Sequence, residues 1–147
     1  MASTTIPSGN QLFANQATNR DYISRTASVS FDVPTLAAAR TCQAVINRVG
    51  TDCTMTLNNF ADTNKNATAQ PLVIPNVIPL EFRPARDLTA FTVIRYDGPY
   101  TPVISFIRAD GALVLTRDYA GREIEAGKPV GWDRMVFHWS VNTGGLP

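Results

Sequence analysis

The sequence has few of the residues that usually mark a catalytic or metal-binding protein. It contains one histidine, His138, and two cysteines, Cys42 and Cys53, which belong to no C-x-x-C pattern. A metal site usually needs several such ligands close together. The phosphate-binding patterns G-x-x-x-x-G-K-[ST] and G-x-G-x-x-G are also missing. We therefore predict no catalytic, cofactor-binding or metal-binding residues, and no cofactor.

Long apolar runs and an excess of charge of one sign are missing too. No stretch approaches the roughly 20 apolar residues that cross a bilayer, and the first five residues lack the charged start of a signal peptide. The formal net charge is +1, whereas a nucleic-acid-binding domain usually has a strong basic excess. These features predict a chain made in the cytoplasm, with free thiols, that binds neither nucleic acid nor membrane.

Lysine is scarce, with two residues against eleven arginines. Arginine tolerates partial burial and is enriched at protein interfaces, where lysine is depleted. A GC-rich genome would produce the same bias, so both explanations stay open.

Alternation of polar and apolar residues predicts that most of the chain is β-strand. The predicted strands are 26–33, 52–60, 88–96, 103–109, 112–117, 123–126 and 134–142. Prolines at 71, 75 and 79 cannot donate to a central ladder, so 71–80 is predicted as an edge strand or an extended crossing. A long polar loop is expected at 58–70.

Residues 35–49 allow two interpretations. Apolar residues recur at helical spacing from Leu36 to Val49, between Pro34 and Gly50, and this favours a helix. The β-branched content of 42–49 favours a strand instead. The helix is preferred, and the strand is kept as the alternative.

The Asp110-Gly111 pair predicts a hairpin with a two-residue type I′ turn. This register opposes Arg108 to Leu113, Phe106 to Leu115 and Ile104 to Arg117. One face then carries Ile104, Phe106, Leu113 and Leu115, and the other carries Val103, Ser105, Ile107, Val114 and Thr116. Both faces are partly apolar, so we expect something to cover each of them.

The predicted strands and turns fit a mainly β protein of 147 residues. We predict an extended N-terminal arm at 1–25 and one domain at 26–147, a two-sheet antiparallel β-sandwich with one short helix at most. A jelly roll is preferred, an immunoglobulin-like sandwich comes second and a barrel third.

Scattered apolar residues of the arm and the second face of the hairpin are the candidate contacts with a partner. The predicted assembly interface is Leu12, Phe13, Tyr22, Ile23, Val103, Ile107 and Val114. His138 and Ser140 share one face of the last strand and offer a weak hydrolase hypothesis, although an exposed strand histidine is the commoner explanation. Glu123 and Glu125 fit the solvated face of a strand.

The polar arm (Met1 to Asn19), the small β-domain, the few lysines and the final Asp133-Arg-Met-Val-Phe-His-Trp-Ser-Val141 resemble the small jelly-roll virion proteins of tailed bacteriophages. The resemblance implies a non-enzymatic capsid decoration (cement) protein of the virion, made in the host cytoplasm. Such a protein is often a homotrimer and binds the major capsid protein. The alternative is a receptor- or carbohydrate-binding head domain of a tail fibre, using loops 58–70 and 97–102 with Tyr96 and Tyr100.

Overall fold

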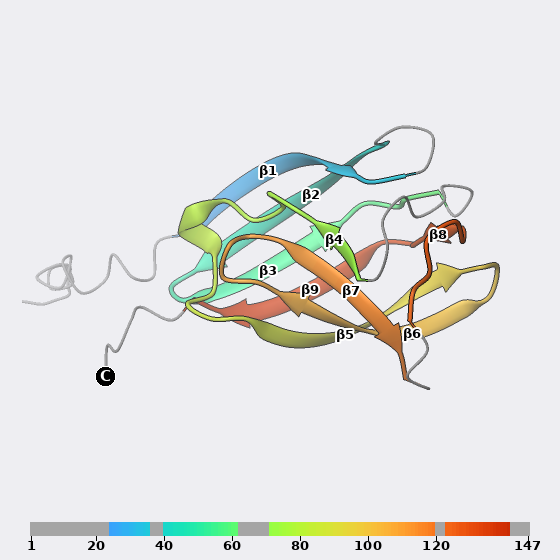
Figure 1. Cartoon of the computed structure of the whole chain (residues 1–147). Coiled ribbons are helices and arrows are strands. Elements are labelled where there is room, and N and C mark those ends of the chain that lie inside the picture. Colours follow the sequence, from blue (N-terminus) through green and yellow to red (C-terminus); the bar gives the residue numbers. More distant parts are fainter. Residues whose placement is uncertain (1–23, 36–39, 62–70, 120–122, 142–147) are drawn as a thin grey trace, which may run out of the picture.

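The computed structural model describes residues 24–35, 40–61, 71–119 and 123–141. Four strands form the first antiparallel sheet, in the order β1-β2-β3-β9 (Figure 1). They are β1 (Ser24–Val33), β2 (Arg40–Val49), β3 (Asp52–Leu57) and β9 (Met135–Ser140). Each strand alternates between a polar outward face and an apolar inward face, which is why the sequence pattern found three of them.

Five strands form the second antiparallel sheet, in the order β4-β7-β6-β5-β8. They are β4 (Leu72–Ile74), β5 (Leu88–Tyr96), β6 (Tyr100–Ile107), β7 (Leu113–Asp118) and β8 (Val130–Gly131), with the short 3-10 helix η2 (Leu80–Phe82) between β4 and β5. β4, which Pro71 and Pro75 flank, lies at the edge of its sheet, which is one of the two predictions for 71–80. Proline lacks the N–H that a central strand would donate.

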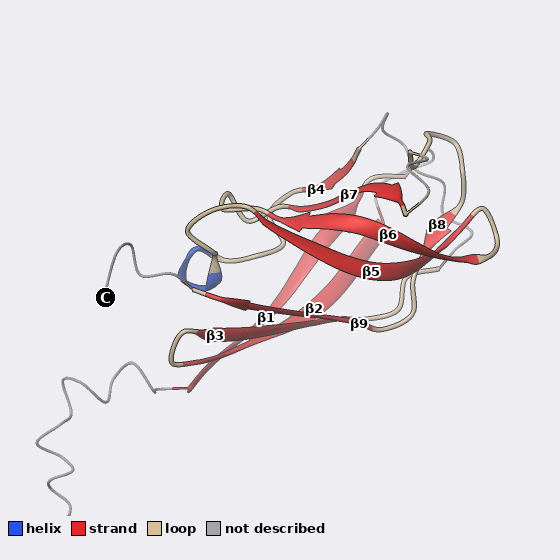
Figure 2. Cartoon of the chain, turned by 90° about the horizontal axis from the view of Figure 1, so that it is seen from below, coloured by secondary structure: helices blue, strands red, loops and turns tan. Residues whose placement is uncertain are grey.

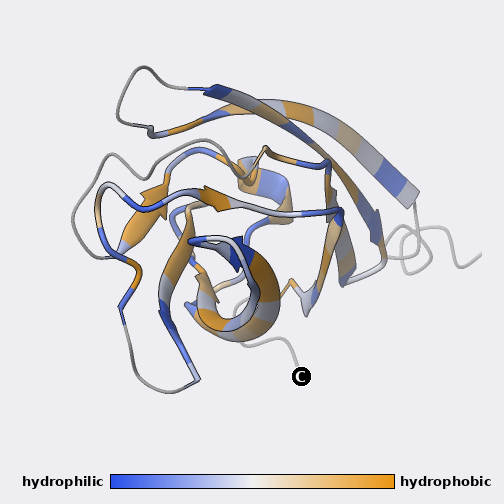
Figure 3. Cartoon of the chain, turned by 90° about the vertical axis from the view of Figure 1, so that its right-hand side faces the viewer, coloured by the Kyte–Doolittle hydropathy of each residue, from blue (hydrophilic) through white to orange (hydrophobic). Residues whose placement is uncertain are grey.

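The two sheets pack face to face as layers (Figure 2). Apolar and polar residues alternate along the strands (Figure 3), and the inward side chains form one core. Its largest fully buried members include Trp132, Phe82, Ile46, Met55, Leu57, Ile94 and Leu113. The predicted two-sheet antiparallel β-sandwich is therefore confirmed. Among the described strands, β4 to β7 form a Greek key, and β1 to β3 form a meander in the other sheet. A jelly roll combines two Greek keys.

The helix preferred for 35–49 is wrong, because β2 occupies the described part of that segment. Cys42, Ala44 and Ile46 are buried and point inward, while Val45 is 38% exposed. Antiparallel pairing with β1 on one side and β3 on the other satisfies the backbone of β2. These tertiary contacts outweigh a helical spacing that local propensity supports only weakly.

The hairpin between β6 and β7 turns through three residues, not two. The Gly111 N–H donates to the Arg108 carbonyl at 2.9 Å, and the Arg108 N–H donates to the Ala112 carbonyl at 2.9 Å. Gly111 has a φ of 92°, and Asp110 is not in the positive-φ region. A type I turn closed by a left-handed glycine therefore replaces the predicted type I′ turn.

The extra turn residue shifts the register of the hairpin by one near the turn. Phe106 pairs with Val114, and Ile107 pairs with Leu113. A β-bulge then restores the predicted pairing of Ile104 with Arg117. The predicted division into faces is therefore wrong. The buried Val103 and Ile107 join Leu113 and Leu115 in the core, while Ile104 and Phe106 point outward.

Two smaller expectations concern the end of the chain and the cysteines. Residues 123–126 form no strand, and only Glu123 makes a bridge, to Arg117. Cys42 and Cys53 are free, as predicted, and both are buried. Burial raises the pKa of both thiols, that of Cys53 to about 11, which makes them unreactive at neutral pH. Among the described residues, no helix is long and apolar enough to span a membrane.

Candidate functional site

The outer surface of the five-stranded sheet carries large apolar side chains. We call it the aromatic face, and its apolar members are outward residues of β5, β6 and β7 and the residue after β7: Phe91, Val93, Tyr100, Pro102, Ile104, Phe106, Val114 and Tyr119. Thr89, Arg95 and Arg117 are the polar residues of the same face. Strand pairing sets Phe91 opposite Ile104 and Val93 opposite Pro102. Because paired residues on one face are neighbours, these side chains form one continuous surface.

Four large apolar members of the aromatic face are exposed. Phe91 is 64% exposed, Tyr100 63%, Tyr119 60% and Val93 49%. The rings of Phe91 and Tyr119 meet edge to face, with centroids 5.7 Å apart and an interplanar angle of 79°. Aromatic pairs of this kind are typical of cores and interfaces, and contiguous exposed apolar patches mark interaction sites in soluble proteins.

The structure separates the residues that were predicted for an assembly interface. Val103 and Ile107 lie in the core and offer no surface to a partner. Val114 lies on the aromatic face between Phe106 and Val73, although its neighbours leave it only 4% exposed. The remaining four lie outside the described residues: Leu12, Phe13, Tyr22 and Ile23.

The main exposed residues of the aromatic face were missed as interface candidates. For Phe91 and Val93 the signal existed, because the alternation in 88–96 puts both on one face of the strand and Ile94 on the other. The structure confirms this, since Ile94 is buried and the other two are exposed. Tyr119 lies beyond the alternating segment of its strand. Its contact with Phe91 arises only from the folded sheet.

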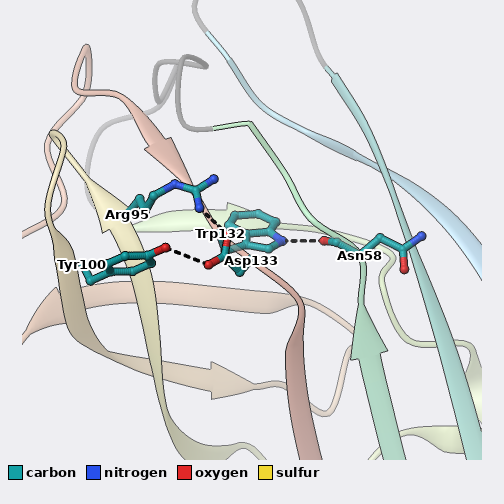
Figure 4. A network of polar contacts seen from close by, with 5 residues as sticks. All are labelled: Asn58, Arg95, Tyr100, Trp132 and Asp133. Carbon is teal, nitrogen blue, oxygen red and sulfur yellow. Dashed lines mark hydrogen bonds and ion pairs between the residues drawn. The ribbon is translucent and has the colours of Figure 1, made fainter.

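An ion-pair cluster borders the aromatic face at the end near the β5–β6 turn (Figure 4). Asp133 accepts a hydrogen bond from Tyr100 Oη at 2.9 Å and forms an ion pair with Arg95. The Arg95 guanidinium also lies 5.9 Å from the centroid of the Tyr100 ring, a cation–π distance. These contacts tie the β5–β6 hairpin to the segment that leads into β9.

The Asp133 carboxylate gives a pH-dependent prediction. The hydrogen bond from Tyr100, and then the contacts with Arg95, lower the pKa of Asp133 below its ordinary value. A lowered folded-state pKa means that the carboxylate stabilises the fold above its unfolded pKa and loses this contribution as the pH falls through the folded pKa. Carboxyl NMR titration should place the midpoint of Asp133 below that of an unpaired aspartate.

Tyr100→Phe removes the hydroxyl donor and keeps the ring over Arg95, so it is the matched control. In this variant the pKa of Asp133 should move up toward its ordinary value. An identical midpoint in wild type and variant would contradict the assignment of the Tyr100 hydroxyl as the main cause.

A second contact joins the two sheets behind this cluster (Figure 4). The buried Trp132 stacks on Phe60 with ring centroids 4.8 Å apart. Its Nε1 donates to the Asn58 carbonyl at 3.1 Å, and the backbones of Phe60 and Trp132 exchange two hydrogen bonds. The segment after β3 is thereby held against the end of β8. No sequence motif marked this contact.

An open pocket of about 280 Å³ lies beside the β5–β6 turn, where loop 97–102 was predicted to bind a ligand. Its lining residues are Tyr96, Asp97, Pro99, Thr101, Glu123, Glu125 and Lys128. The Tyr96 hydroxyl accepts from the Glu125 N–H at 2.9 Å, so it positions the 123–125 segment. Tyr100 is 63% exposed but belongs to the ion-pair cluster, and residues 62–70 of the other predicted loop lie outside the described part.

His138 lies on the outer face of the four-stranded sheet, away from the aromatic face. Its Nδ1 lies 3.1 Å from Thr54 Oγ1, and Thr54 is its partner across the β3–β9 pair. Ser140 pairs with Asp52 in the same ladder. His138 is thus hydrogen-bonded to a threonine. In a Ser–His–Asp triad the histidine is hydrogen-bonded to the nucleophilic serine.

Within the described segments, no group of three or more His, Cys, Asp or Glu residues is arranged to hold a metal ion. No protein-family profile matches the chain, and no curated protein sequence matches it. Four of the eight exposed large hydrophobic residues in the described part of the chain lie on the aromatic face: Phe91, Val93, Tyr100 and Tyr119.

Proposed function

We propose that this chain is a non-enzymatic structural protein of a tailed-phage virion, a capsid decoration protein that acts by assembly through the aromatic face. The observation that carries the proposal is the exposure of Phe91, Tyr119 and Val93 on a sandwich whose core is complete without them. The free energy falls when another surface covers exposed aromatic residues on a pleated sheet, because apolar area is removed from water.

The size of the exposed surface supports this proposal. From the fractional exposures of Phe91, Val93, Tyr100 and Tyr119, these four side chains offer about 400 Å² of mainly apolar surface. The largest apolar patch of a soluble monomer has this order of area and is often functional. The partly exposed Ile104 and Phe106 extend the same surface.

The surroundings of His138 also favour a structural role over catalysis. The histidine and Ser140 are exposed on the outer face of the four-stranded sheet, where no described residue covers them and shields a reacting group from water. Catalytic groups usually lie in a concave site that positions the substrate and removes water.

The pocket beside Tyr96 favours a second candidate, the receptor- or carbohydrate-binding domain of a tail fibre. It offers one aromatic ring together with carboxylates from Glu123 and Glu125, polar groups of the kind that orient a small ligand. The pocket is open and lies outside the aromatic face, so the two proposals involve different surfaces.

Immunogold electron microscopy of virions purified from the host that carries this gene tests the proposal. An antibody against the folded chain should label the heads of the particles. Label confined to the tails would replace the proposal by the second candidate. Particles without label, from preparations in which the chain stays in the soluble fraction, would overturn both.

A further inference from the structure

We infer that the aromatic face binds a second copy of this chain, face to face about a two-fold axis. The inference rests on the proposed function only in that both assign this face to assembly. It goes further by naming the occupant of the face. Three properties of the described residues support it: area, charge and shape.

The first property is area. Two aromatic faces that cover each other remove about 800 Å² of exposed surface through Phe91, Val93, Tyr100 and Tyr119 alone. Peripheral residues of β5 to β7 add to this value. The total then approaches the 1,200–2,000 Å² of a standard specific interface. A homodimer is also the arrangement in which each apolar residue counts twice, because the contact is isologous.

The second property is charge. A face that meets its own copy must place few unpaired charges near the axis, because each charge meets its own image. Of the arginines of β5 to β7 and their turns, Arg95 at one end of the face is paired with Asp133, and Arg108 at the other end is paired with Asp110 at 2.7 Å. The third, Arg117, is exposed on β7 opposite Ile104 and is the charge that a partner copy has to accommodate. The whole chain has a formal net charge of +1, so two copies repel each other little.

The third property is shape. The outer face of a pleated sheet packs on another sheet about 10 Å away, with side chains of the two faces interdigitating. The edge-to-face pair of Phe91 and Tyr119 presents both a ring face and a ring edge. Two copies of this pair can therefore complement each other in offset or edge-to-face contacts.

The opposite surface of the sandwich lacks these properties over its described residues. Val45, Val49 and Val136 are exposed there, but Thr56 lies between Val45 and Val136, and Val49 pairs with Asp52. The neighbouring Thr54 and His138 are hydrogen-bonded to each other. This surface offers single valines within a polar sheet face, so it supplies a control.

Sedimentation equilibrium of the wild-type chain tests the inference directly. The wild type should be a dimer at micromolar concentration and dissociate on dilution. Phe91→Ser should weaken the dimer by at least about 100-fold, because each dimer loses two exposed rings from its centre. Val93→Ser should weaken it by a smaller factor.

Val136→Ser is the matched control, since Val136 is 50% exposed and Val93 is 49% exposed. This variant should dimerise like the wild type. Circular dichroism checks that each variant is folded, and Val93→Ser keeps the test valid if Phe91→Ser does not fold. A monomeric wild type overturns the inference, and so does an oligomer that Val93→Ser and Val136→Ser affect equally. Head labelling of virions together with either result would leave the proposed function standing and the two-fold contact refuted.

Discussion

Trp132→Ala should lower the free energy of unfolding by about 3–5 kcal/mol, the usual cost of removing a buried tryptophan. The indole is 0% exposed and stacks on Phe60. Its removal leaves a cavity between the two sheets and deprives the Asn58 carbonyl of a donor. Urea unfolding followed by far-UV circular dichroism, at a concentration where the chain is monomeric, measures the loss.

Trp132→Phe separates the two contributions of the tryptophan. This variant keeps an aromatic ring against Phe60 but loses the hydrogen bond to Asn58. Its unfolding free energy should therefore fall between those of wild type and Trp132→Ala. A loss below about 1 kcal/mol for Trp132→Ala, within the range of ordinary surface substitutions, would refute the role of this residue in joining the sheets.

Gly111→Ala should cost about 3 kcal/mol, from backbone strain and a steric clash together. Gly111 has a φ of 92°, which costs an L-residue about 1–2 kcal/mol. An added Cβ would lie 2.6 Å from both Arg83 Nε and the Ile78 carbonyl oxygen. These two atoms are hydrogen-bonded to each other at 2.8 Å, so relief of the clash breaks a native contact. Chemical denaturation measures the loss.

Gly98→Ala is the matched control for this prediction. Gly98 has a φ of 110°, but an added Cβ there meets nothing within 4 Å. It should cost only the backbone strain, about 1–2 kcal/mol. Equal losses for the two alanine variants would show that the close packing of Gly111 against η2 and its flanking residues contributes nothing.

The strands with one buried and one solvated face could be predicted from the sequence. In β1, β3 and β9 the period of two is unbroken, because each has a core on one side and water on the other. In β2 the same period exists, but the exposed Val45 and Val49 obscure it and produce a helical spacing. Pairing with two neighbouring strands decided the conformation, and that information is not local.

The candidate site could be predicted in kind but not in its residues. A region with two apolar faces was expected to need a partner, and the outward Phe91 and Val93 fit that expectation. The assignment of Val103 and Ile107 to an interface failed because one extra residue in the turn at 109–111 slips β6 by one residue relative to β7, which puts Val103 and Ile107 on the same face as Leu113 and Leu115. Turn length depends on backbone geometry that the Asp-Gly pair alone does not determine.

Hydroxyl-radical footprinting over a range of protein concentrations tests the central claim, that the aromatic face is the surface by which this protein assembles. At low concentration Phe91 and Tyr119 should react readily, in accordance with their exposed fractions of 64% and 60%. As assembly proceeds, both rings should become protected, while the exposed His138 on the opposite sheet should keep its reactivity. Equal oxidation of Phe91 and Tyr119 at every concentration, or protection of His138 in their place, would contradict the claim.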